Sequence, residues 1–177
     1  MKRALMILAL CPSLVAAQPQ EEFGDRWKVF RPLIGVWEGA GTGEWGNSSV
    51  DAHCQFILNG RFLEMRTRAV YPASQKNSSG AAQEELAIVS FDSDRKTFVL
   101  RQFQGRGLVN QAVLDSISTD GKTIQFTSEA LENVPRGWRA RVTYQFVNDR
   151  ELIYRFEFAP PDKGFEPHSE INLKRKE

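Results

Sequence analysis

The sequence predicts an all-β fold, a ten-stranded antiparallel up-and-down β-barrel with a short N-terminal helical segment. Apolar and polar residues alternate along ten consecutive segments after residue 35, and a period of two is typical of half-buried strands. Turn-forming residues separate these segments at short, even intervals, with no helical pattern between them. Strands that follow one another in this way close most easily into a barrel, because closure leaves no exposed sheet edge.

The turn signals set the expected strand boundaries. The expected strands are 37–45, 50–58, 61–71, 85–91, 97–104, 108–115, 123–129, 139–147, 151–158 and 168–174. Asn59-Gly60 is the strongest hairpin signal among the connections, because both residues tolerate a positive φ. The longest expected connection is the loop 72–83. A barrel of ten strands tends to leave room for a small ligand, so its inner face is both core and pocket wall.

A helical segment is expected just before the first strand. Phe23, Trp27 and Phe30 are spaced by four and three residues, which places them on one face of a helix. Pro32 fits the end of this segment, because proline interrupts helical hydrogen bonding. Such a segment would cover one end of the barrel.

The first strand, within the stretch GVWEGAGTGEW, has glycine at alternate positions. Gly39, Gly41 and Gly43 share one face of the strand with Trp37 and Trp45. Glycine weakens a strand, so its repeated use requires a reason. A phosphate-binding loop is excluded because no helix follows the glycines. The bare strip instead predicts a strand that coils sharply and lets other backbone or a flat ligand come close.

Residues 1–17 are expected to be a signal peptide, and residues 18–177 a single barrel domain. Two basic residues precede an apolar run from Ala4 to Val15, and small residues follow up to Ala17. The run has 12 residues, fewer than the roughly 20 that span a bilayer. The pattern predicts export, periplasmic or secreted, after cleavage near Ala17 and without integral membrane association.

The chain that remains after cleavage at residue 17 is nearly neutral. It has 21 basic and 22 acidic side chains, mixed along its length. This balance gives no electrostatic footprint for nucleic acid and no polybasic patch for a membrane surface. Cys54 is its one cysteine, so no internal disulfide is expected and the core must hold the domain together.

The sequence offers no residue that can be named as catalytic. It has no G-x-S-x-G, Walker or C-x-x-C pattern and no obvious catalytic pair of carboxylates, since adjacent Glu84 and Glu85 must lie on opposite faces or at exposed ends. Candidate inward charges lie inside strand-like stretches at Glu64, Arg66, Arg101, Arg141 and Arg155. Alternation exposes half of each strand, so each of these side chains also has a surface interpretation. An inward arginine would bind the acidic head group of a ligand.

Histidine is the commonest metal ligand in proteins, and His53 and His168 are the two histidines of the chain. His53 and Cys54 are adjacent on a strand and point to opposite faces, so they cannot share a metal ion there. His168, at the start of the last strand, is a candidate axial ligand for haem iron, and the alternative is a surface histidine. Strict alternation puts His168 on the face opposite Ile171 and Leu173. A ligand role therefore requires a β-bulge, or a position before regular pairing begins.

Two segments resemble the nitrobindin family of haem-binding β-barrels. Residues 32–41, PLIGVWEGAG, resemble the opening of that family, which begins its barrel with G-x-W-x-G-x-G after a short apolar segment. Pro167-His168, followed by Leu173, looks like the family's last strand, whose histidine is the proximal haem ligand. The segments 98–104 and 108–127 resemble exported bacterial proteins of unassigned function in the same broad superfamily.

The resemblance implies a barrel of the fatty-acid-binding-protein and lipocalin form with haem b as the candidate cofactor. It implies that His168 is the axial ligand and that Trp37, Gly39 and Gly41 bind the cofactor. A haem-bound protein would act on nitric oxide or isomerise peroxynitrite to nitrate. The alternative is a non-catalytic carrier or sensor of a small apolar or amphipathic ligand such as a fatty acid. A barrel that acts through its outer surface is the third hypothesis.

Overall fold

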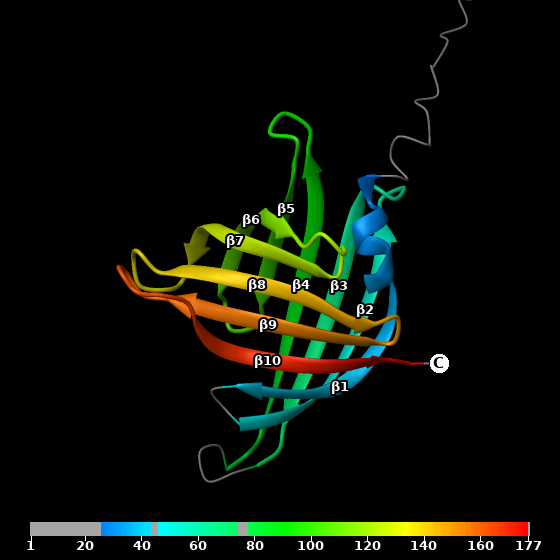
Figure 1. The fold of residues 1–177 in the computed structure, drawn as a ribbon. Coiled ribbons are helices and arrows are strands. Elements are labelled where there is room, and N and C mark those ends of the chain that lie inside the picture. Colours follow the sequence, from blue (N-terminus) through cyan, green and yellow to red (C-terminus); the bar gives the residue numbers. More distant parts are fainter. Residues whose placement is uncertain (1–25, 44–45, 74–77, 177) are drawn as a thin grey trace, which may run out of the picture.

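The computed structural model describes residues 26–43, 46–73 and 78–176. Ten antiparallel strands form a closed barrel, in which each strand pairs with its neighbours in sequence and β1 pairs with β10 (Figure 1). A short 3-10 helix, η1 (Lys28–Leu33), precedes the first strand. The predicted fold class is therefore confirmed. In the part of the chain just defined, no helix is long and apolar enough to cross a bilayer.

Each expected strand has a counterpart in the structure. The strands are β1 (Gly35–Gly43), β2 (Gly46–Ile57), β3 (Phe62–Tyr71), β4 (Ala81–Asp92), β5 (Thr97–Gln104), β6 (Val109–Ile117), β7 (Thr123–Glu132), β8 (Arg139–Asn148), β9 (Glu151–Ala159) and β10 (Glu166–Arg175). β5 has the predicted bounds, whereas β2 and β4 begin earlier than expected. The first residues of β2 and β4 are polar or small and lack apolar alternation. They are strand residues because they pair with the neighbouring strands β1 and β3. Phe23 and Trp45 lie outside the described residues.

The apolar side chains of all ten strands meet inside the barrel in one core. The largest fully buried side chains in it include Trp37, Phe126 and Phe156. Along β8 the buried apolar residues recur at every second position from Ala140 to Phe146, as alternation predicts. Removal of this apolar surface from water is the main favourable contribution to folding.

The helical segment η1 closes one end of the barrel. Trp27, Phe30 and Leu33 are all buried, and the Phe30 ring lies 4.7 Å from that of Phe98 on β5. The Trp27 ring lies 5.4 Å from that of Phe56 on β2. These edge-on aromatic contacts are favourable beyond the area they bury. The predicted cover at one end of the barrel is therefore confirmed.

The last strand is tied to the chain around η1 by Arg175. Its guanidinium group lies 4.3 Å from the centre of the Trp37 ring and donates hydrogen bonds to the carbonyl oxygens of Pro32 and Ile34. The backbone N–H of Lys176 donates to the carbonyl of Val36 at 2.8 Å. Figure 1 shows the helical segment on the side of the barrel where the C-terminus lies.

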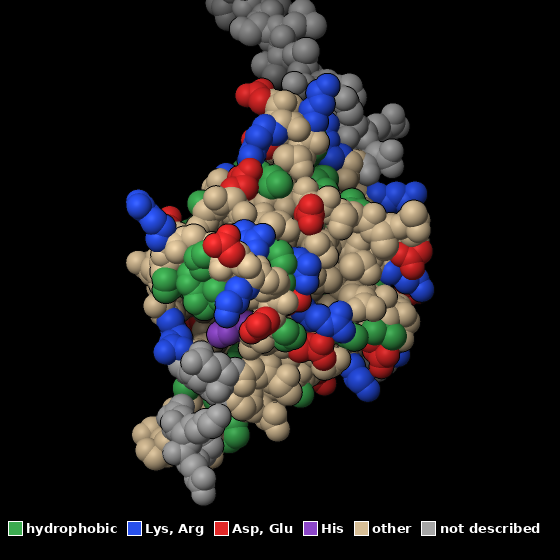
Figure 2. Space-filling view, turned by 60° about the vertical axis from the view of Figure 1, so that its left-hand side comes forward, with side chains coloured by type: hydrophobic (Ala, Val, Ile, Leu, Met, Phe, Trp, Pro, Cys, Tyr) green, Lys and Arg blue, Asp and Glu red, His purple; other side chains and the backbone are tan. Residues whose placement is uncertain are grey.

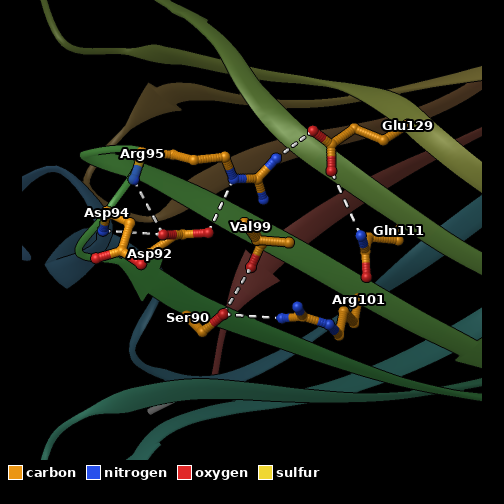
Figure 3. A network of polar contacts seen from close by, with 8 residues as sticks. All are labelled: Ser90, Asp92, Asp94, Arg95, Val99, Arg101, Gln111 and Glu129. Atoms are coloured by element: carbon orange, nitrogen blue, oxygen red, sulfur yellow. Dashed lines mark hydrogen bonds and ion pairs between the residues drawn. The ribbon is translucent and has the colours of Figure 1, made fainter.

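The five candidate inward charges all face outward, so the surface interpretation applies to each of them. On β3, Leu63 and Met65 belong to the core, so Glu64 and Arg66 point away from it and bond to each other at 2.9 Å. Arg101 donates to the hydroxyl of Ser90 on the neighbouring strand (Figure 3).

Arg141 and Arg155 also make ion pairs with carboxylates on adjacent strands. Arg141 bonds to Glu157 at 2.7 Å and Arg155 to Glu170 at 2.6 Å. Basic and acidic side chains are interspersed over the face in Figure 2. An arginine at these positions is satisfied by the outer surface and is not available to a ligand in the barrel.

Candidate ligand-binding site

A cavity of about 120 Å³ opens at the end of the barrel opposite η1. β1 leads away from η1 and ends at Gly43, and β3 and β5 end nearby at Tyr71 and Gln104; all three of these residues line the cavity. The apolar part of its wall is formed by Met65, Ala69, Phe156, Ile171 and Leu173. One end of the barrel is thus filled by aromatic rings, and the other holds a space for a small ligand.

The glycine strip of β1 faces the interior, and its missing side chains are replaced mainly by protein. A Cβ at Gly39 would lie 1.9 Å from the carbonyl oxygen of Asn172 on β10. A Cβ at Gly41 would lie 2.9 Å from the Ser48 hydroxyl and 3.2 Å from Ile171. The sequence offered two reasons for the glycine strip, close approach of other backbone or of a ligand. Close approach of backbone applies at Gly39, whereas Gly41 also lines the cavity.

Trp37 belongs to the closed end of the barrel and not to the cavity. Its indole N–H donates to the carbonyl of Leu33 at 2.8 Å, and its side chain is fully buried. Of the residues that the sequence predicted to bind a cofactor, Gly41 and His168 line the cavity, while Trp37 and Gly39 do not. The structure therefore brings together only two of the four.

His168 sits at a β-bulge at the cavity mouth. Pro167 pairs with Glu157 and Ser169 pairs with Phe156, which leaves His168 as the extra residue of β10. A bulge redirects the side chain of the extra residue, and the exposed His168 ring lies 5.0 Å from that of Phe158. The structural condition for a ligand role is met, whereas haem binding stays a prediction. Within the described ranges, no three His, Cys, Asp or Glu side chains are grouped to hold a metal ion.

The inner face carries a carboxyl group, on Glu85 of β4, that the sequence analysis did not single out. The side-chain amide of Gln102 donates to its Oε1 at 2.9 Å, and that of Gln104 donates to its Oε2 at 3.1 Å. Gln102 also donates to the Tyr154 hydroxyl at 2.9 Å and accepts from the Asn110 amide at 2.9 Å. These side chains from four strands form a polar cluster, of which Glu85, Gln104 and Tyr154 line the cavity.

Burial raises the pKa of Glu85 above its usual value of 4.5, and the amide donors Gln102 and Gln104 only partly oppose this effect. Glu85 is half-buried and lines the cavity. The pKa values of Tyr144 and Tyr154 are raised well above 10.0, mainly by burial and also by the nearby Glu85 charge. An ion-pair partner for Glu85 does not occur among the described residues.

Alternation contained the signal for Glu85, because it has the same parity as the buried Ala87 and Val89. The adjacent Glu84 points outward and lies 4.0 Å from Arg68. The two carboxyl groups therefore lie on opposite faces of the sheet, which is one of the two arrangements that the sequence predicted. The sequence does not reveal that amide side chains of β5 converge on Glu85, since this depends on the register between β4 and β5.

No protein-family model and no curated protein matches this sequence. Among solved structures, Rv2717c from M. tuberculosis is similar, with a TM-score of 0.63 and 15% identity over 86% of this chain and 98% of that chain. The S-type phycobiliprotein lyase CPES from Guillardia theta has a TM-score of 0.53 and 10% identity over 91% of this chain and 99% of that chain. At such identities the likeness establishes the fold alone.

Proposed function

We propose that the barrel binds a small amphipathic ligand in the cavity opposite η1. The observation that carries this proposal is the cavity itself, which combines an apolar wall with the polar side chains of Glu85, Gln104 and Tyr154. Apolar surface buried there contributes roughly 25 cal/mol per Å². The volume of about 120 Å³ is below the roughly 300–1,000 Å³ of sites for drug-sized molecules. The ligand is therefore small, or only its apolar end enters.

The fold shared with known structures supports this proposal only in showing that the same scaffold occurs in other proteins. A protein with the same barrel is named as a lyase for phycobiliprotein, so barrels of this kind act on other molecules. Fold alone does not transfer a function, and the proposal therefore rests on the cavity of this chain.

The test is displacement of an apolar fluorescent dye, Nile red, from the mature chain. Ala69→Trp and Ser169→Trp place bulk in the cavity from β3 and β10, and each should weaken dye binding at least about tenfold. Ala82→Trp, on the exposed face of β4, is the matched control and should leave dye affinity unchanged. Absence of saturable binding to the wild type, or equal binding by all three variants, would overturn the proposal.

A second candidate function, haem binding, is favoured by the bulge at His168. An imidazole at the mouth of an apolar cavity fits the axial ligand of haem b, and Phe156 and Phe158 beside it fit the face of a macrocycle. The cavity of about 120 Å³ is small for a whole macrocycle, so the fit rests on the mouth. Bound ferric haem would supply nitric oxide or peroxynitrite chemistry, and the chain would hold it and limit the access of water.

The haem proposal is tested by adding hemin to the mature protein and recording its absorption spectrum. We expect a shifted Soret band in the wild type that His168→Ala abolishes. His53→Ala, which alters an exposed histidine on β2, should leave the band unchanged. A wild type without a shifted band would end the haem proposal, and a band that survives His168→Ala would remove His168 from it.

We also propose that the protein acts outside the cytoplasm. The support is the signal-peptide pattern of residues 1–17, which lie outside the described residues. Intact-mass measurement of the protein from the periplasm or medium should give a chain that begins near Gln18. Recovery of the full-length chain from the cytoplasm alone would contradict export.

A further inference from the structure

We propose that Glu85 makes the cavity selective for a cationic hydrogen-bond donor, so that the ligand is a small alkyl amine in its protonated form. This inference rests on the proposed function, because it assigns the head group of the ligand in the same cavity. It differs from the expectation of an acidic head group held by an inward arginine. The inward charged side chain found on β4 is a carboxyl group, and the candidate arginines face outward.

The hydrogen-bonding capacity of Glu85 is only half used. Each carboxylate oxygen accepts one amide hydrogen bond, from Gln102 or from Gln104. An ionised carboxylate accepts about four hydrogen bonds, which leaves about two for a group in the cavity. A buried charge without a counter-ion is costly, and a cation that enters the cavity removes this cost.

The residues behind Glu85 hold it in place. Gln102 is fully buried and is fixed by Asn110 and by the Tyr154 hydroxyl. The unused acceptor positions of Glu85 suit a donor-rich group, and an ammonium group has three donors and no acceptor.

The other charged or titratable groups that line the cavity belong mainly to its mouth. They are Tyr71, Glu84, Arg106, Tyr154 and His168. Arg106 already interacts with another group, and Glu84 faces outward near Arg68. An ammonium group in the cavity would meet the carboxyl group of Glu85, with the Tyr154 hydroxyl also in the lining. A carboxylate ligand would instead meet a like charge there, which disfavours binding.

The apolar wall fits the remainder of such a ligand. Met65 and Ala69 line the cavity from β3, and Ile171 and Leu173 line it from β10. A short alkyl chain packed against them would keep its ammonium group at Glu85. The cavity therefore recognises two parts of one molecule, a donor cation and an aliphatic chain.

The experiment compares hexylamine, hexanol and hexanoate as competitors of Nile red at neutral pH. We expect hexylamine to bind at least about tenfold more tightly than hexanol, a difference of about 1.4 kcal/mol, and hexanoate to bind most weakly. Glu85→Gln has nearly the same shape but no charge, and it should bind hexylamine and hexanol equally. Glu38→Gln, on the exposed face of β1, is the control and should retain the preference.

A second readout uses the wild type alone, in case Glu85→Gln fails to fold. Hexylamine stays protonated well above neutral pH, as a lysine side chain does. Its affinity should rise as pH increases through the raised pKa of Glu85, because the carboxyl group then becomes charged, while hexanol affinity stays flat. Equal affinity of amine and alcohol, or parallel pH profiles, would overturn the inference and leave the proposed function standing. Failure of all three ligands and of the dye would remove both.

Discussion

Gly39 shows what one missing side chain contributes to barrel closure. It pairs with Val50 on β2 and with Leu173 on β10, at the seam where the first and last strands meet. The carbonyl oxygen of Asn172 occupies the space where a Cβ would lie, 1.9 Å from its ideal position. Any other residue would push the two strands apart.

We expect Gly39→Ala to lower the free energy of unfolding by about 1–3 kcal/mol or more, because overpacking forces backbone shifts. Urea unfolding measures this change. Gly164→Ala is the control, since a Cβ there meets no atom within 4 Å, and it should change stability by less than about 0.5 kcal/mol. Equal losses from the two substitutions would contradict the role of the close approach.

Glu85 makes folding stability depend on pH. In the unfolded chain the pKa of Glu85 is near 4.5, and burial raises it in the folded chain. Between the unfolded and the folded pKa, the folded chain keeps the proton and the unfolded chain loses it. The wild type should therefore lose stability as pH rises through this window. Glu85→Gln removes this loss, so the variant should gain stability relative to the wild type as pH rises from 4.5 through this window. Urea unfolding over this range measures the difference, and parallel curves would show that the pKa is not raised.

At the scale of elements, η1 closes one end of the barrel. Its segment contributes three buried side chains to a core otherwise built by the strands, and Phe30 lies within 6.2 Å of rings from both β5 and β7. A 3-10 helix of this length has little stability of its own. Its position therefore depends on the aromatic contacts.

Phe30→Ala should lower the free energy of unfolding by roughly 3–5 kcal/mol, because it removes a fully buried ring and leaves a cavity. Lys28→Ala, an exposed change in the same helix, should have little effect. Thermal or urea unfolding compares the two variants. A loss as small for Phe30→Ala as for Lys28→Ala would show that η1 does not stabilise the barrel.

At the scale of the whole molecule, the sheet formed by the described residues closes on itself, because β1 and β10 complete the ring of strands. Local opening is then restricted, and groups inside should become accessible only when much of the barrel opens. Cys54 on β2 reports on this property, since its side chain is fully buried and burial raises the pKa of its thiol to about 12.

We expect a thiol reagent such as DTNB to modify Cys54 only as fast as the barrel unfolds, because the thiol is buried and protonated. Cys11→Ser removes the second cysteine of the full chain, which lies outside the described residues. Reaction rates should rise in step with urea unfolding. Complete modification within seconds under native conditions would show that the barrel opens locally at β2.

The local pattern of the chain was enough to predict the barrel, the order of its strands and the face on which the glycines lie. A period of two assigns each side chain to one face of a strand, and turn residues mark where strands end. The helical segment that covers one end of the barrel was predicted in the same way, from the spacing of Trp27 and Phe30. These predictions depend on neighbours in sequence, so one chain contains the information they require.

The site required the folded molecule, because it depends on which residues meet across strands. Alternation alone put His168 on the outer face, and only the pairing of β10 with β9 created the bulge that turns it to the cavity mouth. Glu85 meets the amide groups of Gln102 and Gln104 because of the register between β4 and β5. The register of a hairpin is set by its turn and by the apolar pattern of both strands, so it is a property of the pair and not of either strand alone. Strand order was thus readable along the chain, whereas the chemistry of the cavity arose from contacts between residues far apart in it.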